Sequence, residues 1–289
     1  MKLHKETNIL IVGLGLLGGS YAMALKRQGF KINAITKEQS SVDYALRNGI
    51  IDYGTVETDA GLIGSADLCI FALYPHIFYE WIRDNQQYFK TGAVITDVTG
   101  VKGCIVDKIQ GILRPDVEFI AAHPMAGREV SGVENSTPEM FKGANYIVVP
   151  TKINTPGAVE LCRDLGEKLG FSHISELSAE EHDKMIAFLS QLTHCIAVSL
   201  MCCNNTSGLE YYTGDSFRDI TRIAKINDEM WSELFLDNRE ALLYEMESFK
   251  KTFDKLYDAV ATGDREGMRR MMRRSTEHRK RFDKGETLK

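Results

Sequence analysis

The sequence predicts an α/β protein in which a doubly wound parallel sheet is followed by an all-α domain. In the first part, short β-branched and apolar runs alternate with segments of helical periodicity, which is typical of a parallel sheet covered on both faces. After residue 178 the pattern is helical, with no convincing strand. A chain of 289 residues can bury two cores, so we expect one domain at 1–177 and a second at 178–289.

The expected elements of the first domain follow from local composition. The runs that favour strands are residues 8–12, 31–36, 67–73, 93–97, 118–122 and 144–149. Helical spacing is found in 17–28, 39–47 and 158–169, and a short strand is expected at 173–176. Ser178 and Glu181 then form a capping box, a hydroxyl followed three residues later by a carboxylate, which predicts a helix start.

The helical half has two distinctive segments. Residues 196–203 are apolar on nearly every side, which suits a helix buried all round. Residues 268–282 are rich in arginine and favour a solvated helix over a nucleic-acid site, because the whole chain is acidic. Such a helical half is a natural dimer-forming module, although packing within a monomer would give the same pattern.

Composition excludes several classes of partner. A net charge of −5 argues against nucleic acid or an anionic membrane surface, and we expect no apolar stretch long enough to span a bilayer. The start of the chain lacks a signal-peptide pattern. The six cysteines show no CxxC spacing and most lie in apolar surroundings, which favours buried free thiols in a reducing cytoplasm and no metal site.

A glycine-rich turn follows the first expected strand. Residues 13–18 read GLGLLG, which matches the GxGxxG fingerprint of Rossmann-type dinucleotide binding, with a strand before it and a helix after it. The first glycine permits the tight turn, the second lets the backbone approach a pyrophosphate, and the third lets helix and strand pack closely. The helix start should hold the phosphates. The residues expected to contact the nucleotide here are Gly13, Gly15, Leu16, Leu17 and Gly18.

The end of the second strand bears on which nucleotide binds. An NAD site usually places a carboxylate about 20 residues after the glycine turn, where it holds the ribose diol. Here the strand ends in Thr36 and Lys37, with Ser40 shortly after, and no carboxylate occupies the place. A hydroxyl and a cation suit a 2′-phosphate better, so the sequence favours NADP. The alternative is that Lys37 is a surface lysine and NAD binds.

Two further strand ends carry polar residues. His123 directly follows the run 118–122, and ligands in such sheets bind outside the carboxyl ends of the strands. Pro124 disfavours helix at His123. This position favours a functional histidine over a structural one that caps the strand. Thr99, in the loop after 93–97, either lines the nicotinamide pocket or belongs to a turn.

Four ordered motifs span nearly the whole chain: GLGLLGGS, TDVTGVKG, AAHPMAGRE and FRDITRIA. Together they resemble the prephenate/arogenate dehydrogenases of tyrosine biosynthesis. The resemblance implies a Rossmann domain joined to a helical dimerisation domain, and therefore a homodimer formed through that domain. It also implies NAD(P)-dependent oxidation of a cyclohexadienol with loss of CO2, giving 4-hydroxyphenylpyruvate from prephenate or tyrosine from arogenate.

The resemblance assigns catalytic roles to His123 and Arg222. His123 matches the histidine of the family's HPxxG motif, where a neutral imidazole accepts the hydroxyl proton as hydride leaves. Arg222 matches the arginine that binds a substrate carboxylate, with Asp219 as its orienting partner. If the segment is helical, Arg218, Asp219 and Arg222 share one face. Without the resemblance, a surface ion pair of little energetic value would be favoured.

Polar side chains beyond these are expected to contact the substrate. Gln191 and His194 belong to a polar stripe on an otherwise apolar helix, and Glu129 is expected to gate the pocket. Gly100 stands where many family members have serine, so a hydroxyl that bonds the catalytic histidine is either missing or supplied by Thr99. Gln191 stands where many members have histidine. The residues expected to bind substrate are Gln191, His194, Arg218, Asp219, Glu129 and Thr99.

Two other functions fit parts of the sequence. One is another two-domain NADP-dependent oxidoreductase of the 3-hydroxyacid dehydrogenase or imine reductase type. Those enzymes usually depend on a lysine in the helical domain, where this chain offers Gln191 and His194. The other is a non-catalytic NADP-binding sensor, which would tolerate the loss of His123 and Arg222.

Overall fold

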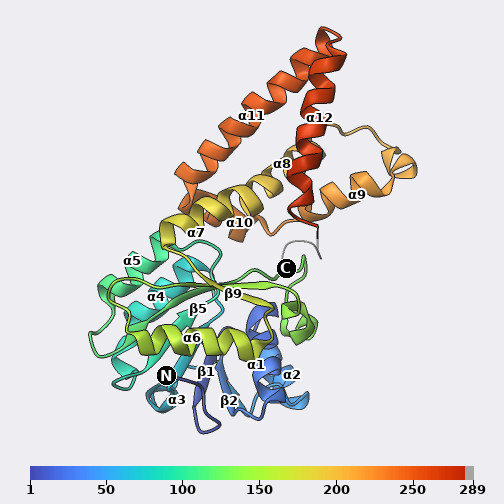
Figure 1. Cartoon of the computed structure of the whole chain (residues 1–289). Helices are drawn as coiled ribbons and strands as arrows, with labels where there is room; N and C mark the ends of the chain where they lie inside the picture. The colour runs from blue at the N-terminus through green and yellow to red at the C-terminus, as the bar shows by residue number, and fades with distance from the viewer. Residues whose placement is uncertain (284–289) are drawn as a thin grey trace. The chain divides into compact units, whose positions relative to one another are not determined.

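The computed structural model describes residues 1–283, which fall into two compact units. The first unit comprises residues 1–239 and holds both sheets and the helices up to α10; the second begins at Glu240. The fold class is the predicted one, a parallel sheet domain followed by helices (Figure 1). After residue 178 the described part of the chain contains no strand.

The strands form two sheets. In chain order they are β1 Ile9–Val12, β2 Ile32–Ile35, β3 Tyr53–Thr55, β4 Leu68–Phe71, β5 Val94–Asp97, β6 Glu118–Phe119, β7 Ala121–Pro124, β8 Asn145–Val149 and β9 His173–Glu176. The larger sheet has the order β3-β2-β1-β4-β5-β6 and is parallel throughout. The smaller sheet has the order β7-β8-β9, with β7 antiparallel and β9 parallel to β8.

Helices surround these sheets and then continue alone. In chain order they are α1 Leu16–Arg27, α2 Gln39–Arg47, α3 Ala60–Ser65, α4 Pro75–Asn85, α5 Gly103–Ile112, α6 Pro156–Leu169, α7 Ala179–Ile186, α8 Leu192–Cys202, α9 Asp215–Thr221, α10 Asp228–Asp237, α11 Arg239–Ala261 and α12 Arg265–Lys280. The predicted capping box is present at the start of α7, because Ser178 and Glu181 bond each other's backbone N–H groups.

The larger sheet is covered on both faces because its central strands are apolar at every position. Along β1, Ile9 and Ile11 pack into one core cluster with side chains of α1 and α6. Leu10 and Val12 point the other way, into a second cluster with side chains of α4 and α5. This alternation is the period of a strand buried on both sides. The two layers therefore hold the strand ends, and the loops that leave them, in fixed positions.

The expected strand at 118–122 is divided between the two sheets. Glu118 and Phe119 pair with β5, and then the chain leaves the larger sheet at Ile120. The next residues form β7, in which His123 is paired with Ile147 of β8. The expectation that His123 directly follows a strand end was therefore wrong: it lies within β7. The run of apolar residues did not reveal the division, because both halves are buried.

The helix that begins at α7 corrects two further expectations. Residues 179–202 are long and apolar enough, by length and composition alone, to cross a membrane, although no such stretch was expected. The segment 185–203 contains no Asp, Glu, Lys or Arg, so nothing charged interrupts it. Residues 196–203 were expected to be buried all round, but Leu200 is 39% and Met201 is 48% exposed. A π-helical turn, Ala187–Gln191, joins α7 to α8.

The second unit is a pair of helices joined by a tight turn. Gly263 adopts φ +70° in that turn, and Asp264 caps α12 by accepting the N–H of Gly267. The described part of α12 is exposed along most of its length, as predicted for a solvated helix. On α11, large apolar side chains such as Phe253 (57% exposed) face solvent.

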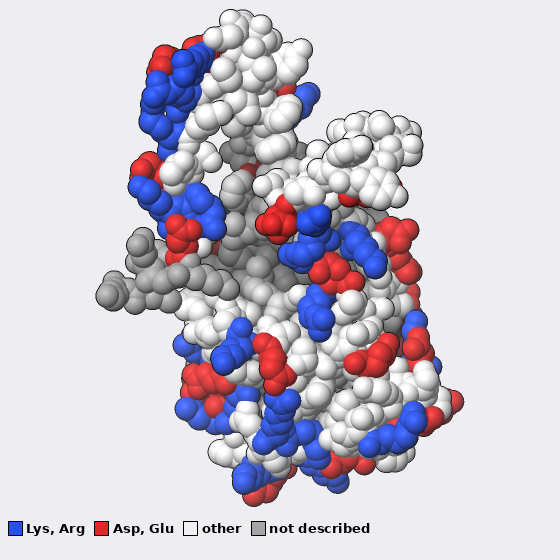
Figure 2. All heavy atoms as spheres, turned by 90° about the vertical axis from the view of Figure 1, so that its right-hand side faces the viewer, with Lys and Arg blue, Asp and Glu red and all other residues white. Residues whose placement is uncertain are grey.

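The state of the cysteines agrees only in part with what the composition predicted. All six cysteines are free, as predicted, but Cys202 and Cys203 are exposed rather than buried. On the face shown in Figure 2, Lys and Arg side chains are interspersed with Asp and Glu over the lower part of the molecule, where the sheets lie.

Candidate active site

The glycine turn has the shape that a pyrophosphate requires. Gly13 adopts φ +98°, and a Cβ there would lie 2.4 Å from the carbonyl oxygen of Ala72. A Cβ on Gly18 would lie 1.9 Å from the carbonyl oxygen of Gly13, so α1 packs against the turn only with glycine there. By contrast, a Cβ on Gly15 would meet nothing within 4 Å. The space above Gly15 and the uncapped start of α1 fit a dinucleotide phosphate.

The residues after β2 divide into two kinds. The Thr36 hydroxyl accepts the N–H of Leu14 at 3.3 Å, so this side chain helps to hold the glycine turn. Lys37 and Ser40 are exposed on the surface beyond the strand end. These side chains lie where the ribose of a nucleotide bound at the turn is expected.

A single pocket of about 870 Å³ joins this turn to the residues of the expected chemistry. Gly15, Leu16 and Leu17 line one part of it, and His123 and Arg222 line another. All of its lining residues belong to the first compact unit. His123 and Arg222, which are far apart in the chain, therefore share one cavity with the glycine turn.

His123 is partly buried at the base of this pocket, and its ring is tied to α7. Its Nδ1 lies 2.8 Å from Nε2 of His182, whose own Nδ1 lies 2.7 Å from Oδ1 of Asp183. Burial, assisted by the nearby His182 and Lys102, lowers the pKa of His123 well below its ordinary value. Its imidazole is therefore neutral at neutral pH and can accept a proton.

A fully buried lysine fixes the loop beside His123. The ammonium group of Lys102 donates to Asp97 at 2.6 Å, to the Thr99 hydroxyl at 3.1 Å and to the backbone carbonyl of Ala122 at 2.6 Å. Asp97 in turn accepts the N–H of Ala122 at 3.1 Å. The strand that carries His123 is thus held to the end of β5 by a buried ion pair.

Thr99 and Gly100 line the pocket but offer no hydroxyl to His123. The Thr99 hydroxyl donates to Asp97 and lies within the buried lysine cluster. Of the two alternatives for the family's serine, the structure favours a missing hydroxyl, since the partner of His123 Nδ1 is His182. A Cβ on Gly100 would lie 3.4 Å from Leu234, an ordinary contact.

Arg222 pairs with a different carboxylate from the one expected. It follows α9 in a 3-10 turn, and its guanidinium donates to Glu129, which also lines the pocket. Asp219 is exposed and lies outside the pocket lining. Arg218 points to Asp215, at 3.0 Å, and to the carbonyl of Thr213. The helix ends at Thr221, so the face expected to hold all three residues is interrupted before Arg222.

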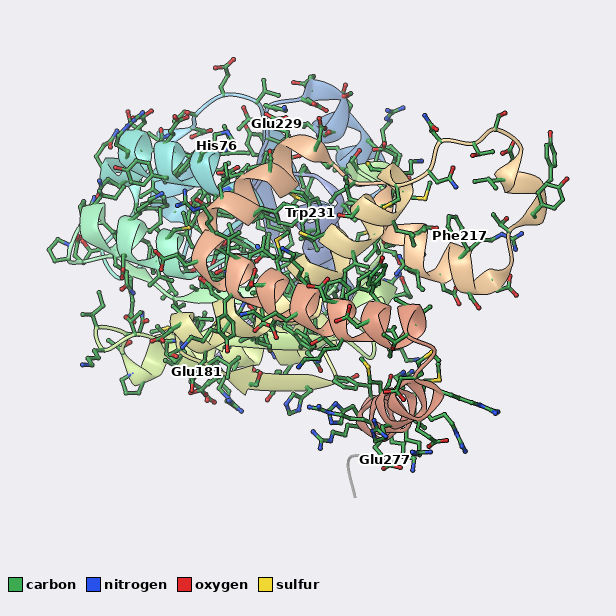
Figure 3. The ribbon with its side chains drawn as sticks, turned by 90° about the horizontal axis from the view of Figure 1, so that it is seen from above. His76, Glu181, Phe217, Glu229, Trp231 and Glu277 are labelled. Atoms are coloured by element: carbon green, nitrogen blue, oxygen red, sulfur yellow. The ribbon has the colours of Figure 1, made fainter. Side chains whose placement is uncertain are left out.

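Gln191 and His194 both line the pocket, but their side chains are held by different contacts. The Gln191 amide donates to the carbonyl of Leu234 at 2.7 Å and accepts from Asn238 at 2.7 Å, so both of its ends are engaged. The His194 ring lies against Trp231, with centroids 3.7 Å apart, and its Nδ1 donates to Ser190. In Figure 3, Trp231 lies on α10, whereas Phe217 lies out on α9.

Sequence reasoning missed three residues around His123. His182 and Asp183 read as ordinary polar positions in the first turns of a helix, and Lys102 read as part of a loop. The signal available for Lys102 was its place in TDVTGVKG beside a strand end. No spacing rule connects His182 to His123, because 59 residues separate them and only the fold brings them together.

Comparison with known proteins identifies the family. The family model described as the nucleotide-binding domain of prephenate dehydrogenase matches residues 21–175, and the model of its dimerization domain matches residues 178–274. The prephenate dehydrogenase of Bacillus subtilis (strain 168) is 30% identical over 286 residues, which cover 96% of this chain and 76% of that protein. The chain belongs to the prephenate dehydrogenase family. It is accordingly an oxidoreductase with a nicotinamide-nucleotide domain and the family's dimerization domain.

Solved structures agree in fold. A prephenate dehydrogenase from A. aeolicus, in complex with hydroxyphenyl propionate and NAD+, superposes with a TM-score of 0.88 and 30% identity, covering 98% of this chain and 100% of that one. The arogenate dehydrogenase of Synechocystis gives a TM-score of 0.81 at 23% identity, covering 96% and 100%. The second likeness concerns the fold alone.

Proposed function

We propose that this protein oxidises prephenate with NAD(P)+ and releases the ring carboxylate as CO2, giving 4-hydroxyphenylpyruvate in tyrosine biosynthesis. The observation that carries the proposal is the single pocket in which a dinucleotide-binding turn, a neutral imidazole and several cationic side chains meet. The nicotinamide nucleotide, when bound, supplies the hydride acceptor. The protein supplies the orientation of the substrate and the handling of one proton.

His123 is the group proposed to handle that proton. As hydride leaves the carbinol carbon, the hydroxyl proton passes to the imidazole and the oxygen becomes a carbonyl. The electron pair of the bond to CO2 then enters the ring, which becomes aromatic, and the resulting phenolate oxygen recovers the proton from His123. A base of this kind typically contributes about 10² to 10⁴ in rate.

The charges that line the pocket suit a substrate with two carboxylates. Three cationic side chains, Arg128, Arg222 and Lys225, line the pocket together with one carboxylate, Glu129. Prephenate carries two carboxylates and a keto group, whereas arogenate has an ammonium group in place of the keto group, and this ammonium would meet the positive lining. The proposal therefore names prephenate, with Arg222 exchanging Glu129 for a substrate carboxylate. Gln191, His194 and Thr99, which line the pocket, stay predicted substrate contacts, whereas Arg218 and Asp219 do not line it.

We propose NADP as the preferred nucleotide, with NAD as the alternative. Lys37 and Ser40 are exposed beyond β2, where a 2′-phosphate would lie. The residue directly after β2 is Thr36 rather than a carboxylate, and the nearest carboxylate, Glu38, is exposed at the start of α2. An exposed cation and a hydroxyl favour the phosphate.

We propose a cytoplasmic homodimer formed through residues 178–289. The dimerization-domain match and the exposed apolar side chains of α8 and α11, among them Met201 and Phe253, support this assembly. The exposed apolar face of residues 179–202 is then covered by a second subunit rather than by lipid. The functional boundary is proposed at residues 177 and 178, between the ends of the two family matches.

A matrix of two substrates and two nucleotides tests the proposal. Prephenate and arogenate are each incubated with NAD+ and with NADP+, and reduced nicotinamide is followed by absorbance. The expected result is turnover of prephenate, faster with NADP+. Faster turnover of arogenate would show that arogenate, not prephenate, is the substrate. Faster turnover with NAD+ would show that NAD is the preferred nucleotide. Activity in none of the four mixtures would refute the proposed function.

A further inference from the structure

The chain of hydrogen bonds from His123 into α7 allows only one arrangement of hydrogens when both rings are neutral. The backbone N–H of Lys102 donates to Asp183 Oδ1 at 2.8 Å, and that of Gly103 donates to Oδ2 at 2.7 Å. Because backbone N–H groups can only donate, both carboxylate oxygens act as acceptors. The bond of 2.7 Å between Asp183 and His182 Nδ1 therefore carries its hydrogen on the histidine.

The position of the hydrogen on His182 determines the position of the hydrogen on His123. A neutral His182 with hydrogen on Nδ1 has a bare Nε2, which can only accept. The 2.8 Å contact between His182 Nε2 and His123 Nδ1 therefore carries its hydrogen on His123. A neutral His123 with hydrogen on Nδ1 has its free lone pair on Nε2, the nitrogen needed to accept a proton from a substrate hydroxyl.

We propose that His182 and Asp183 are positioning residues that hold His123 in the tautomer and ring orientation its base function needs. The proposal rests on the function proposed above and concerns residues that contact neither substrate nor nucleotide. Asp183 is anchored at the start of α5 by two backbone N–H groups, and Asn238 donates to its backbone carbonyl at 2.9 Å. His182 is fully buried. The chain of contacts thus runs from a fixed helix terminus to Nδ1 of His123, on the same ring as the reacting Nε2.

The same chain stabilises the ring after it accepts the proton. An imidazolium on His123 keeps its Nδ1–H bond to His182, and Asp183 lies beyond it to polarise that ring. The buried ammonium of Lys102 opposes this charge, but it is paired with Asp97. The titratable groups of this hydrogen-bond network are His182, Asp183, Lys102 and Asp97. Those that line the same pocket as His123 are Tyr74, Arg128, Glu129, His194, Arg222 and Lys225.

Substitution of His182 separates a positioning role from a structural one. His182→Phe keeps an aromatic ring of similar size but removes the acceptor for His123 Nδ1–H. We expect kcat to fall roughly 10- to 100-fold, the range seen when partners that orient a functional imidazole are removed, with little change in KM. The acidic limb of the pH profile should move from its wild-type position, because His123 loses both the hydrogen-bond acceptor and the charge effect of His182 on its pKa. His182→Gln restores an acceptor and should recover most of the loss.

His173→Phe is the matched control, since it removes an exposed histidine of β9 and should leave kcat and the pH profile unchanged. Nucleotide affinity of each variant, measured by fluorescence titration, reports whether the site is still folded. Wild-type kcat and pH profile in His182→Phe would overturn the proposal. A loss in His182→Gln as large as in His182→Phe would also overturn it, because the acceptor would then not matter.

A second readout does not need turnover. Nitrogen-15 chemical shifts of the histidine rings in the free wild-type protein distinguish the two neutral tautomers. The proposal requires hydrogen on Nδ1 of both His123 and His182, and hydrogen on Nε2 of His123 would refute it. If wild type converts neither substrate, the proposed function fails while this measurement still decides the tautomer.

Discussion

At the scale of single residues, the reactivity of His123 follows from what surrounds its ring. Burial removes water from the imidazole, and the nearby ammonium of Lys102 disfavours a second positive charge, so the pKa of His123 is lowered. The pKa of His194, which lines the same pocket, is also lowered, mainly by burial. Both rings are therefore neutral at neutral pH, and the positive charge of the pocket comes from its arginine and lysine side chains.

A pH profile tests this state of His123. The base must be neutral to act, and a lowered pKa means that it becomes protonated only at more acidic pH. We expect kcat/KM for prephenate to stay on its plateau as pH falls through 6.5, the ordinary histidine value, and to decline only below it. A decline centred at or above pH 6.5 in protein that stays folded would show that burial does not control this group.

At the scale of elements, the turn between β1 and α1 makes different demands of its glycines. Gly13 and Gly18 are required by the backbone, whereas Gly15 faces open space. Substitution should therefore separate folding from nucleotide binding. This is the point at which the sequence fingerprint and the structure agree most closely, because the fingerprint encodes local geometry.

Gly15→Ala should leave the thermal unfolding temperature unchanged and weaken nucleotide binding, because the new methyl group occupies the space of the pyrophosphate. Gly18→Ala should instead destabilise the fold, since its methyl group would overlap the carbonyl oxygen of Gly13. Gly111→Ala, at an exposed position in α5 with open space around it, serves as control and should preserve both properties. Normal nucleotide affinity in Gly15→Ala would contradict the assignment of this turn.

The buried pair of Lys102 and Asp97 joins β5, its loop and β7, and so sets the position of His123. Lys102→Met leaves the carboxylate of Asp97 buried without its cation, which typically costs about 3–5 kcal/mol. Replacing both residues, as Asp97→Asn with Lys102→Met, should recover part of the loss. Lys184→Met, which breaks only an exposed pair with Glu180, should change stability little. Chemical denaturation measures all three, and equal stability of Lys102→Met and Lys184→Met would contradict the account.

The sequence predicted local geometry well and contacts between distant segments poorly. The glycine turn, the capping box at Ser178 and most strands depend on neighbours in the chain, and these were found. The division of residues 118–124 between two sheets was missed because both halves are apolar. The pairing of Arg222 with Glu129, 93 residues away, and of His123 with His182 depends on how the helical domain folds against the sheets.

At the scale of the whole molecule, exposed apolar side chains on the helical domain point to assembly. Phe253, on the long helix α11, is 57% exposed, and Met201, near the end of α8, is 48% exposed. Exposed apolar surface of this kind marks a site of protein association. A homodimer would bury it, as expected for a family whose second domain is a dimerization domain.

Light scattering coupled to size exclusion tests the assembly. Wild type should have the mass of a dimer, and Phe253→Asp should shift the population toward monomer, because the interface would have to bury a carboxylate. Leu46→Asp, on an exposed part of α2 in the sheet domain, is the control and should leave the dimer intact. A wild-type monomer would contradict the proposed assembly.

The coupling of CO2 release to nucleotide reduction tests the central claim most directly. Prephenate labelled in its ring carboxylate is incubated with the wild-type protein and NADP+ or NAD+, and released label and reduced nicotinamide are measured together. Equal amounts of the two are expected, with both rates reduced about 10²- to 10⁴-fold in His123→Asn while nucleotide binding persists. Nucleotide reduction without release of label, or full activity in His123→Asn, would contradict the account of this pocket.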